Sequence, residues 1–363
     1  MSRFSIGKSL QMVLDKDILK PCVDMAFLFI LDRKKKGDVM KKISLAVLVL
    51  LLLLTGCSSQ GGSDTQTEKI TIGVLVFAEH PALEATVQGL KDYLAENGLG
   101  EDKVELIIQN AQGDMGSADV IAKKYVADNV DLIYAVATNA AQAAYNATKG
   151  TDIPVIFNAV TDPVAAGLVV DWDNPQTNVS GVSDTAPIEK QVALIKEILP
   201  EATKIGILQN LSEVNTQVQI EIVKEVAEKY GLEIVVKGVS NSGEVATAAQ
   251  QLASQVDAIY NLTDNLIVSS TATIVNQANK VGIPVFAAED GQIDQGLLAS
   301  DSISYYQLGR VAGQMVIDVL VNEEDIATMS VQMASETSLF VNKEVAEELG
   351  IELPESVLNR MEE

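Results

Sequence analysis

Small polar and charged side chains recur in this sequence directly after short apolar runs. Asn158 and Thr161 follow the apolar residues 153–157, and Asp184 follows a second run that ends at Val182. The carboxyl ends of parallel strands meet at one edge of a sheet, and ligands of open α/β sheets bind at that edge. We therefore expect these side chains to line a site for a small polar molecule.

The candidate site residues fall into two sets, one in each half of the chain. The first set is Phe77, His80, Thr138, Asn139, Ala140, Asn158, Val160 and Thr161. The second set is Asp184, Asn210, Thr263, Asp264, Asn265, Glu289 and Asp290. Most of them precede a predicted helix start, where free N–H groups bind anions. Acids are concentrated in the second set.

This asymmetry fits a zwitterionic ligand. The run Thr138-Asn139-Ala140 is predicted to open a helix with Thr138 as the N-cap, a good place for a ligand carboxylate. A ligand ammonium needs a carboxylate, either Asp184 or Asp264, because charge-assisted hydrogen bonds are the strong ones. Helix capping is the alternative role for each acid and stays open here. Phe77 and Val160 are expected to contact the apolar part of the ligand.

Other chemistries find little support in the residue types. His80 is the only histidine, so a His-rich metal site is not expected. Cys57 is the only cysteine after residue 22, and nucleophile, phosphate-loop and zinc motifs are not found. We therefore expect no metal, no cofactor and no enzyme activity. Tyr305 and Tyr306 are expected to pack at a junction rather than contact a ligand.

The elements that must position these residues occur twice. The repeated runs are Ile72-Gly73-Val74-Leu75 with Ile205-Gly206-Ile207-Leu208, Val104 to Ile108 with Leu232 to Val236, Val130 to Tyr134 with Val256 to Tyr260, and Ile153-Pro154-Val155 with Ile283-Pro284-Val285. Their offsets all lie near about 130 residues, far longer than a solenoid repeat, so the repeated unit is a domain. Apolar strands alternate with amphipathic helices in both halves, which predicts parallel sheets covered on both faces.

The fold class is therefore α/β, with two doubly wound lobes. We assign residues 69–182 with 304–330 to the N-terminal lobe and residues 183–303 with 331–363 to the C-terminal lobe. The chain then crosses three times, near Val182, Ile303 and Glu336, which is the type I periplasmic-binding-protein architecture. In the tail, one strand is expected over residues 331–341, and Asn342 is expected to cap a final helix over 343–349.

A secretion signal begins at Met40. Lys41 and Lys42 are followed by apolar residues 43–54 and by Leu54-Thr55-Gly56-Cys57, a pattern that resembles the bacterial lipoprotein signal with lipid on Cys57. The apolar run is too short for a membrane span. Residues 1–39 are interpreted as a mis-assigned start, the alternative being an unusually long charged region. The polar residues 58–68 are expected to form a flexible tether.

The mature chain is strongly acidic. Residues 1–57 hold ten of the 26 basic and five of the 50 acidic residues, so their removal leaves a net charge of −29. Such a surface disfavours nucleic acid and anionic lipid, because phosphate neutralisation needs clustered Lys and Arg.

Five motifs give the chain a family resemblance. They are residues 77–84, Phe157-Asn158-Ala159-Val160-Thr161-Asp162-Pro163, Gly181-Val182-Ser183-Asp184, Thr263-Asp264-Asn265 and Tyr305-Tyr306-Gln307-Leu308-Gly309. Together they resemble substrate-binding lipoproteins of ABC transporters of the tryptophan/tyrosine uptake type. The resemblance implies an extracytoplasmic, lipid-anchored protein that captures an aromatic amino acid and works with an ABC permease and its ATPase.

Two other functions remain open. A ligand-sensing lipoprotein that signals to a membrane partner would use the same two-lobed fold. Permease and ATPase genes next to this gene would favour a transport receptor over such a sensor. An extracytoplasmic enzyme on this scaffold would need a positioned nucleophile or acid pair, and turnover assays would detect it.

Overall fold

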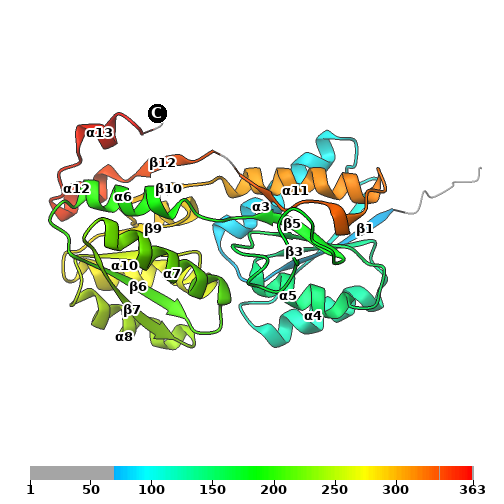
Figure 1. The fold of residues 1–363 in the computed structure, drawn as a ribbon, viewed down its shortest axis with the longest axis horizontal. Coiled ribbons are helices and arrows are strands. Elements are labelled where there is room, and N and C mark those ends of the chain that lie inside the picture. Colours follow the sequence, from blue (N-terminus) through cyan, green and yellow to red (C-terminus); the bar gives the residue numbers. More distant parts are fainter. Residues whose placement is uncertain (1–68, 335, 362–363) are drawn as a thin grey trace, which may run out of the picture. The chain divides into compact units, whose positions relative to one another are not determined.

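The computed structural model describes residues 69–334 and 336–361. Within these residues the chain forms two α/β lobes, each built on a six-stranded sheet, so the predicted fold class is confirmed (Figure 1). The expectations for residues 1–68, including the signal at 40–57, the tether and Cys57, lie outside the described residues, as does the side chain of Asp290.

The first sheet is entirely parallel. Its strands are β1 (Ile70–Val76), β2 (Val104–Asn110), β3 (Leu132–Val136), β4 (Val155–Asn158), β5 (Val179–Ser183) and β11 (Gln332–Met333). Their spatial order is β11-β5-β4-β3-β1-β2. The buried strands β3, β4 and β5 carry no charged residue, as strands covered on both faces require.

The second sheet repeats this order. Its strands are β6 (Lys204–Asn210), β7 (Glu233–Val239), β8 (Ala258–Asn261), β9 (Val285–Ala287), β10 (Ala299–Ser302) and β12 (Ser338–Val341). They are arranged β12-β10-β9-β8-β6-β7, and β12 alone runs antiparallel to its neighbour. The sequence repeat therefore corresponds to two copies of one doubly wound sheet.

The repeated Val-Asp dipeptide has the same structural role in both lobes. The Oδ2 atom of Asp131 accepts a hydrogen bond from the backbone N–H of Thr71 at 2.7 Å, at the start of β1. The Oδ2 atom of Asp257 accepts one from the backbone N–H of Lys204 at 2.8 Å, at the start of β6. Each aspartate thus fixes the register of a central strand against its neighbour.

Helices cover both sheets. The first lobe contains α3 (Pro81–Glu96), α4 (Met115–Ala127), α5 (Thr138–Thr148), α11 (Tyr305–Leu320) and the short η2 (Ile326–Thr328). The second contains α6 (Ile188–Ile198), α7 (Val214–Lys229), α8 (Ser242–Ala253), α9 (Asn265–Ser269), α10 (Thr271–Asn279), η1 (Asp290–Gln295), α12 (Lys343–Leu349) and α13 (Glu355–Leu358). In the described part of the chain, none of these helices is long and apolar enough to cross a membrane.

The tail differs from the expectation in two places. The single strand expected over residues 331–341 is two strands, because β11 pairs with β5 in the first sheet while β12 pairs with β10 in the second. Asn342 does cap α12, since its Oδ1 accepts from the backbone N–H of Val345. The helix is not the last one, because α13 follows it.

Two glycines let α11 return to the first lobe and pack on α3 (Figure 1). A Cβ atom on Gly309 would lie 2.1 Å from the backbone oxygen of Thr86, and a Cβ on Gly89 would lie 2.1 Å from that of Tyr306. Only glycine permits backbones this close, so α11 is held against the first lobe.

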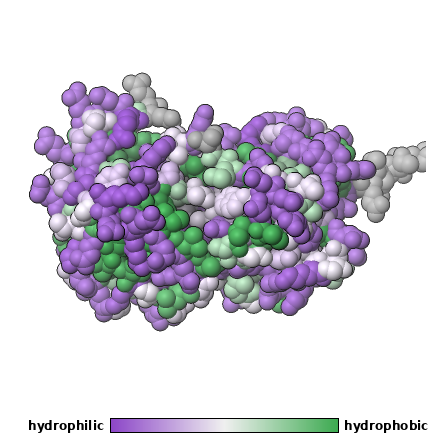
Figure 2. Space-filling view, viewed as in Figure 1, coloured by the Kyte–Doolittle hydropathy of each residue, from purple (hydrophilic) through white to green (hydrophobic). Residues whose placement is uncertain are grey.

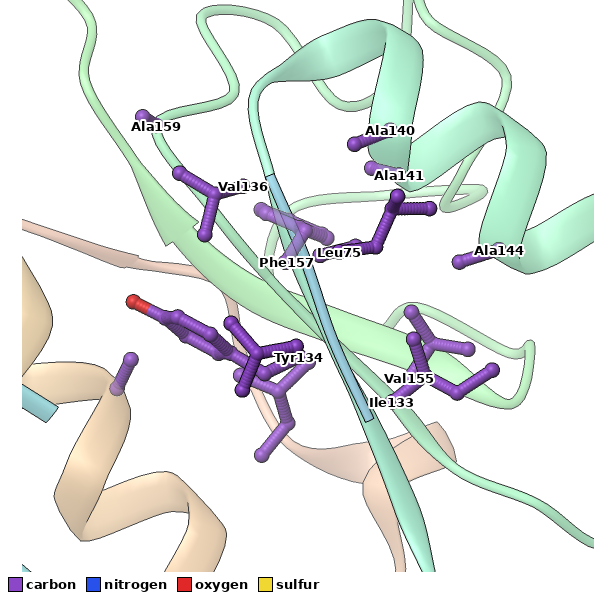
Figure 3. Packing of buried hydrophobic residues seen from close by; sticks show 14 of the residues in the cluster. Leu75, Ile133, Tyr134, Val136, Ala140, Ala141, Ala144, Val155, Phe157 and Ala159 are labelled. Carbon is purple, nitrogen blue, oxygen red and sulfur yellow. The ribbon is translucent and has the colours of Figure 1, made fainter. Parts of the chain in front are cut away.

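Alanines bring α5 close to the first sheet. Figure 3 shows Ala140, Ala141 and Ala144 on the face of α5 that lies against the core, and all three are fully buried. Tyr134 and Phe157 fill the core of the same lobe. Figure 2 shows hydrophilic residues along the margins of this face and hydrophobic residues gathered toward its middle.

Candidate functional site

A small cavity lies between the carboxyl edges of the two sheets. Its volume is about 20 Å³, which is room for about one water molecule. It is lined by His80, Leu83, Ala137, Thr138, Ala159, Thr161, Asp184, Asn215, Thr263, Asp264, Asn265, Val268, Glu289 and Tyr305. Both lobes contribute, and the structure brings eight of the sequence-predicted residues together here: His80, Thr138, Thr161, Asp184, Thr263, Asp264, Asn265 and Glu289.

Two alanines on the first-lobe side have a backbone conformation that favours glycine. Ala137 has a φ of 81° and Ala159 a φ of 55°, and such conformations cost about 1–3 kcal/mol and persist only where the surroundings hold them. The backbone N–H of Ala137 is held by the carbonyl of Asn158 at 2.9 Å. Strain of this kind clusters at binding sites, and here both alanines line the cavity.

The first of these alanines changes the expectation for Thr138. The N-cap of α5 is Ala137, and Thr138 is the first helical residue, so the prediction of a Thr138 cap was wrong. Ala137 has no side-chain oxygen, and no side-chain hydrogen bond caps this helix. The first N–H groups of a helix lack intrahelical acceptors. The start of α5 therefore presents donors at the edge of the cavity.

Asp184 is a buried carboxylate on the cavity wall. Its Oδ1 accepts from the hydroxyl of Thr161 at 3.0 Å, and its Oδ2 accepts from the hydroxyl of Tyr305 at 2.7 Å. Burial raises the pKa of Asp184, and the two hydroxyl donors oppose this only in part. No ion pair links it to a basic side chain within the described ranges. A cation placed in the cavity would satisfy this carboxylate.

Asp264 has a different role, because its oxygens are already occupied. Its Oδ1 caps α9 by accepting from the backbone N–H of Ile267 at 3.2 Å. Its Oδ2 accepts from the backbone N–H of Asn210 at 2.7 Å and the hydroxyl of Thr216 at 2.8 Å. Burial, and then the charge of Glu213, raise the pKa of Asp264. Capping, the alternative left open by the sequence, therefore describes Asp264.

His80 and Asn265 meet across the two lobes. His80 precedes α3, and its Nε2 lies 3.4 Å from the Oδ1 of Asn265 at the start of α9. Burial lowers the pKa of His80 to about 4, and the hydrogen bond to Asn265 opposes this effect. The imidazole is therefore neutral at pH 7. A second contact joins the lobes where the hydroxyls of Thr161 and Thr263 lie 3.4 Å apart.

The remaining predicted residues do not line the cavity. Phe77, Asn139 and Asn210 face a separate groove of about 590 Å³, which Asn265 also lines. Ala140 and Val160 are fully buried behind the site. The Nδ2 of Asn158 donates to the hydroxyl of Tyr134 at 2.8 Å, which makes it part of the core.

The apolar lining also differs from the expectation. Phe77 and Val160 were expected to contact the apolar part of a ligand, whereas the cavity is lined by Leu83 and Val268 together with the two strained alanines. Glu289 reaches the cavity while its Oε2 accepts from the backbone N–H of Gly291 at 2.6 Å.

Sequence reasoning missed two residues that organise the site. Tyr305, expected to pack at a junction, is buried and donates to Asp184. Glu213 is fully buried, and its Oε2 accepts from the side-chain amide of Asn265 at 2.7 Å. Glu213 is the N-cap residue of α7, so an acid at the start of the helix that follows β6 is the signal that could have identified it.

Comparisons with known proteins give matches to substrate-binding proteins. The family model for "ABC transporter substrate binding protein" matches residues 71–363. The tyrosine-binding protein of Clostridioides difficile is 40% identical over 326 residues, which cover 87% of this chain and 94% of that protein.

Two solved structures are similar over almost the same extent. One is an ABC domain from Streptococcus pneumonia in complex with L-Trp, with a TM-score of 0.78 at 38% identity over 81% of this chain and 98% of that one. The other is a ligand-free, open substrate-binding protein with adhesive properties from Clostridium difficile. Its TM-score is 0.62 at 41% identity, over 80% of this chain and 97% of that one.

Proposed function

Because this chain belongs to the ABC transporter substrate binding protein family, we propose that it captures an aromatic amino acid between its lobes for an ABC permease and its ATPase. The observation that carries the proposal is the buried Asp184 carboxylate, which has no basic partner among the described residues and shares a cavity with the start of α5. The ligand class follows two relatives, one named for tyrosine and one solved with L-Trp.

The ligand ammonium is assigned to Asp184. Its carboxylate accepts two hydroxyl hydrogen bonds and can accept further donors, since an ionised carboxylate offers about four lone-pair sites. Asp264 is a poorer candidate because a helix cap and two further donors occupy its oxygens.

The ligand carboxylate is assigned to the start of α5. The backbone N–H groups of Thr138, Asn139 and Ala140 carry the partial positive charge of the helix end. Thr161 assists both assigned positions in this proposal. Its hydroxyl donates to Asp184, and its side chain lines the cavity that the start of α5 also reaches. Asn139 and Ala140 contribute through their backbone in this proposal, because neither side chain lines the cavity.

Binding is proposed to require movement of the lobes. A cavity of about 20 Å³ cannot hold an aromatic ring, since it has room for about one water molecule. At nearly equal identity and coverage, this structure is more similar to the L-Trp complex than to the open, ligand-free protein. This supports rotation of the lobes about the crossings near Val182, Ile303 and Glu336.

The cellular setting follows from the family. Substrate-binding proteins of ABC transporters are extracytoplasmic. We propose in addition that the chain is anchored by a lipid on Cys57, which lies outside the described residues. The relatives reported above are binding proteins, and the family match favours a transport receptor over a sensor.

A thermal-shift screen of the full chain against all amino acids tests the proposed function. A ligand at a hundredfold excess over its Kd stabilises by about 2.7 kcal/mol, so L-tyrosine or L-tryptophan is expected to raise Tm clearly. A screen in which aliphatic or charged amino acids stabilise and aromatic ones do not would overturn the proposal.

A further inference from the structure

Three buried residues form a hydrogen-bonded chain from the second lobe to the first. The Oε2 atom of Glu213 accepts from the Nδ2 of Asn265 at 2.7 Å and from its backbone N–H at 3.0 Å. The Oδ1 of Asn265 then faces the Nε2 of His80 at 3.4 Å. Glu213 is fully buried, and the other two residues are 7% exposed. The chain therefore lies in the protein interior, where hydrogen-bond direction is strongly enforced.

Glu213 fixes the orientation of the Asn265 amide. Its two oxygens accept from Asn210, Asn215 and Leu266 as well as from Asn265, so this carboxylate acts throughout as an acceptor. The reversed amide would place the Oδ1 of Asn265 against a carboxylate oxygen, which is repulsive. The Oδ1 atom must therefore face His80.

The amide orientation in turn fixes the tautomer of His80. An amide oxygen only accepts, so the Nε2 of His80 must carry the hydrogen. The other ring nitrogen, Nδ1, then has a lone pair and accepts. Burial keeps the ring neutral at pH 7, since the pKa of His80 is lowered to about 4. Nδ1 is buried and finds no hydrogen-bond partner among the residues that the structure describes.

His80 and Asn265 line the cavity next to two apolar side chains. Leu83 follows His80 by three residues in α3, and Val268 follows Asn265 by three residues in α9. Residues three apart share a helix face, and all four line the cavity. Asp184 with its two hydroxyl donors forms another part of the cavity lining. An amino acid whose ammonium pairs with Asp184 would direct its ring toward the part that His80, Leu83 and Val268 line.

We propose that Nδ1 of His80 accepts the polar hydrogen of the ligand's ring, the phenol O–H of tyrosine or the indole N–H of tryptophan, and thereby selects against phenylalanine. Glu213 is a positioning residue that acts through Asn265. The proposal rests on the proposed function, because it assumes an aromatic amino acid in this cavity. Phenylalanine would leave the buried acceptor without a partner, and sites built to bind such a hydrogen reject ligands that lack it.

Calorimetry with L-tyrosine, L-tryptophan and L-phenylalanine tests the selection. The parent chain is expected to bind tyrosine or tryptophan at least about tenfold more tightly than phenylalanine. His80→Phe should bring that ratio close to one, and His80→Gln, which keeps an acceptor, should retain part of it. Equal weakening of all three ligands in His80→Phe would indicate a merely structural role and overturn the inference. If no aromatic amino acid binds the parent, the proposed function itself fails.

The single histidine allows a direct test of the chain of hydrogen bonds. Nitrogen-15 NMR of the histidine-labelled full chain, prepared without a histidine tag, should show the Nε2–H tautomer at pH 7. Tyrosine or tryptophan should shift the Nδ1 resonance more than phenylalanine does. Glu213→Gln can donate to Asn265 and release its amide, so the Nδ1–H tautomer should become populated. A parent chain in the Nδ1–H form, or an unchanged tautomer in Glu213→Gln, would contradict the inference.

Discussion

At the scale of single residues, burial decides what the titratable groups of the site do. The pKa of His80 falls from 6.5 to about 4 on folding, so the folded chain binds this proton less readily than the unfolded chain. His80 has no effect on the pH dependence of stability above pH 6.5. As the pH falls from 6.5 to 4, it lowers the free energy of unfolding by about 3 kcal/mol at most.

The buried acids act in the opposite direction. Burial raises the pKa of Asp184 and Asp264, so acid protonates these groups more readily in the folded chain. The contribution of His80 therefore has to be measured as a difference. Between pH 7 and pH 4.5, denaturant unfolding should show a larger loss of stability for the parent than for His80→Gln. Parallel pH profiles of the two proteins would refute this account of His80.

Thr138 is predicted to make a modest contribution to affinity. Thr138→Ala removes a hydroxyl at the cavity but leaves the backbone N–H groups of α5, so we expect binding to weaken by about 0.5–1.5 kcal/mol. Thr148→Ala at the far end of the same helix is the matched control, since Thr148 does not line the cavity. Calorimetry should show unchanged affinity for the control. A loss for Thr138→Ala that is no larger than the control's would remove Thr138 from the site.

The sequence predicted part of the site because strand ends meet at one edge of a parallel sheet. That rule predicted that Thr138, Thr161 and Asp184 lie near one another, and the three residues line one cavity. It did not identify Glu213 or Tyr305, because their hydrogen bonds to Asn265 and Asp184 join residues that are 52 and 121 positions apart in the sequence. It also could not separate Asp184 from Asp264, since capping becomes visible only with the hydrogen bonds of Asp264.

At the scale of elements, the packing of α11 on α3 depends on the absence of a side chain. Gly309→Ala would place a Cβ atom 2.1 Å from a backbone oxygen, which cannot move as a side chain can. We expect a loss of about 1–3 kcal/mol in the free energy of unfolding, as for other overpacked cores. Thermal or denaturant unfolding measures this loss.

A second helical glycine provides the control. Gly116 lies exposed in α4, and the nearest atom to its Cβ position is the Oδ1 of the exposed Asp114 side chain at 3.3 Å. Gly116→Ala should stabilise by about 0.4–1 kcal/mol, because alanine restricts the unfolded chain. Glycine-to-alanine substitution is therefore expected to lower the free energy of unfolding at position 309 and to raise it at position 116. Stabilisation by Gly309→Ala would show that the helices have room to separate.

The sequence repeat predicted both sheets well, since apolar runs and Val-Asp dipeptides recur in register. The short strand β11 could not be predicted in this way. It has only two residues, both exposed, and its place in the first sheet depends on the distant β5. Local patterns carry no information about such a pairing.

At the scale of the whole molecule, the account requires the lobes to open and close. The chain crosses between the sheets near Val182, Ile303 and between β11 and β12. Small-angle scattering should show a smaller radius of gyration when an aromatic amino acid saturates the protein. A non-binding amino acid at the same concentration is the control. An unchanged radius at saturation would count against hinge closure.

The central claim is that Asp184 holds the ammonium of an aromatic amino acid. Calorimetry should compare L-tyrosine or L-tryptophan, whichever binds more tightly, with its analogue that lacks the amino group. Loss of a buried charged partner costs about 2–5 kcal/mol, or about thirty- to several-thousand-fold in Kd, so the parent should prefer the amino acid by that factor. Asp184→Asn should lose this preference, and Asp264→Asn should retain most of it. A full preference for the amino acid in Asp184→Asn would contradict the account.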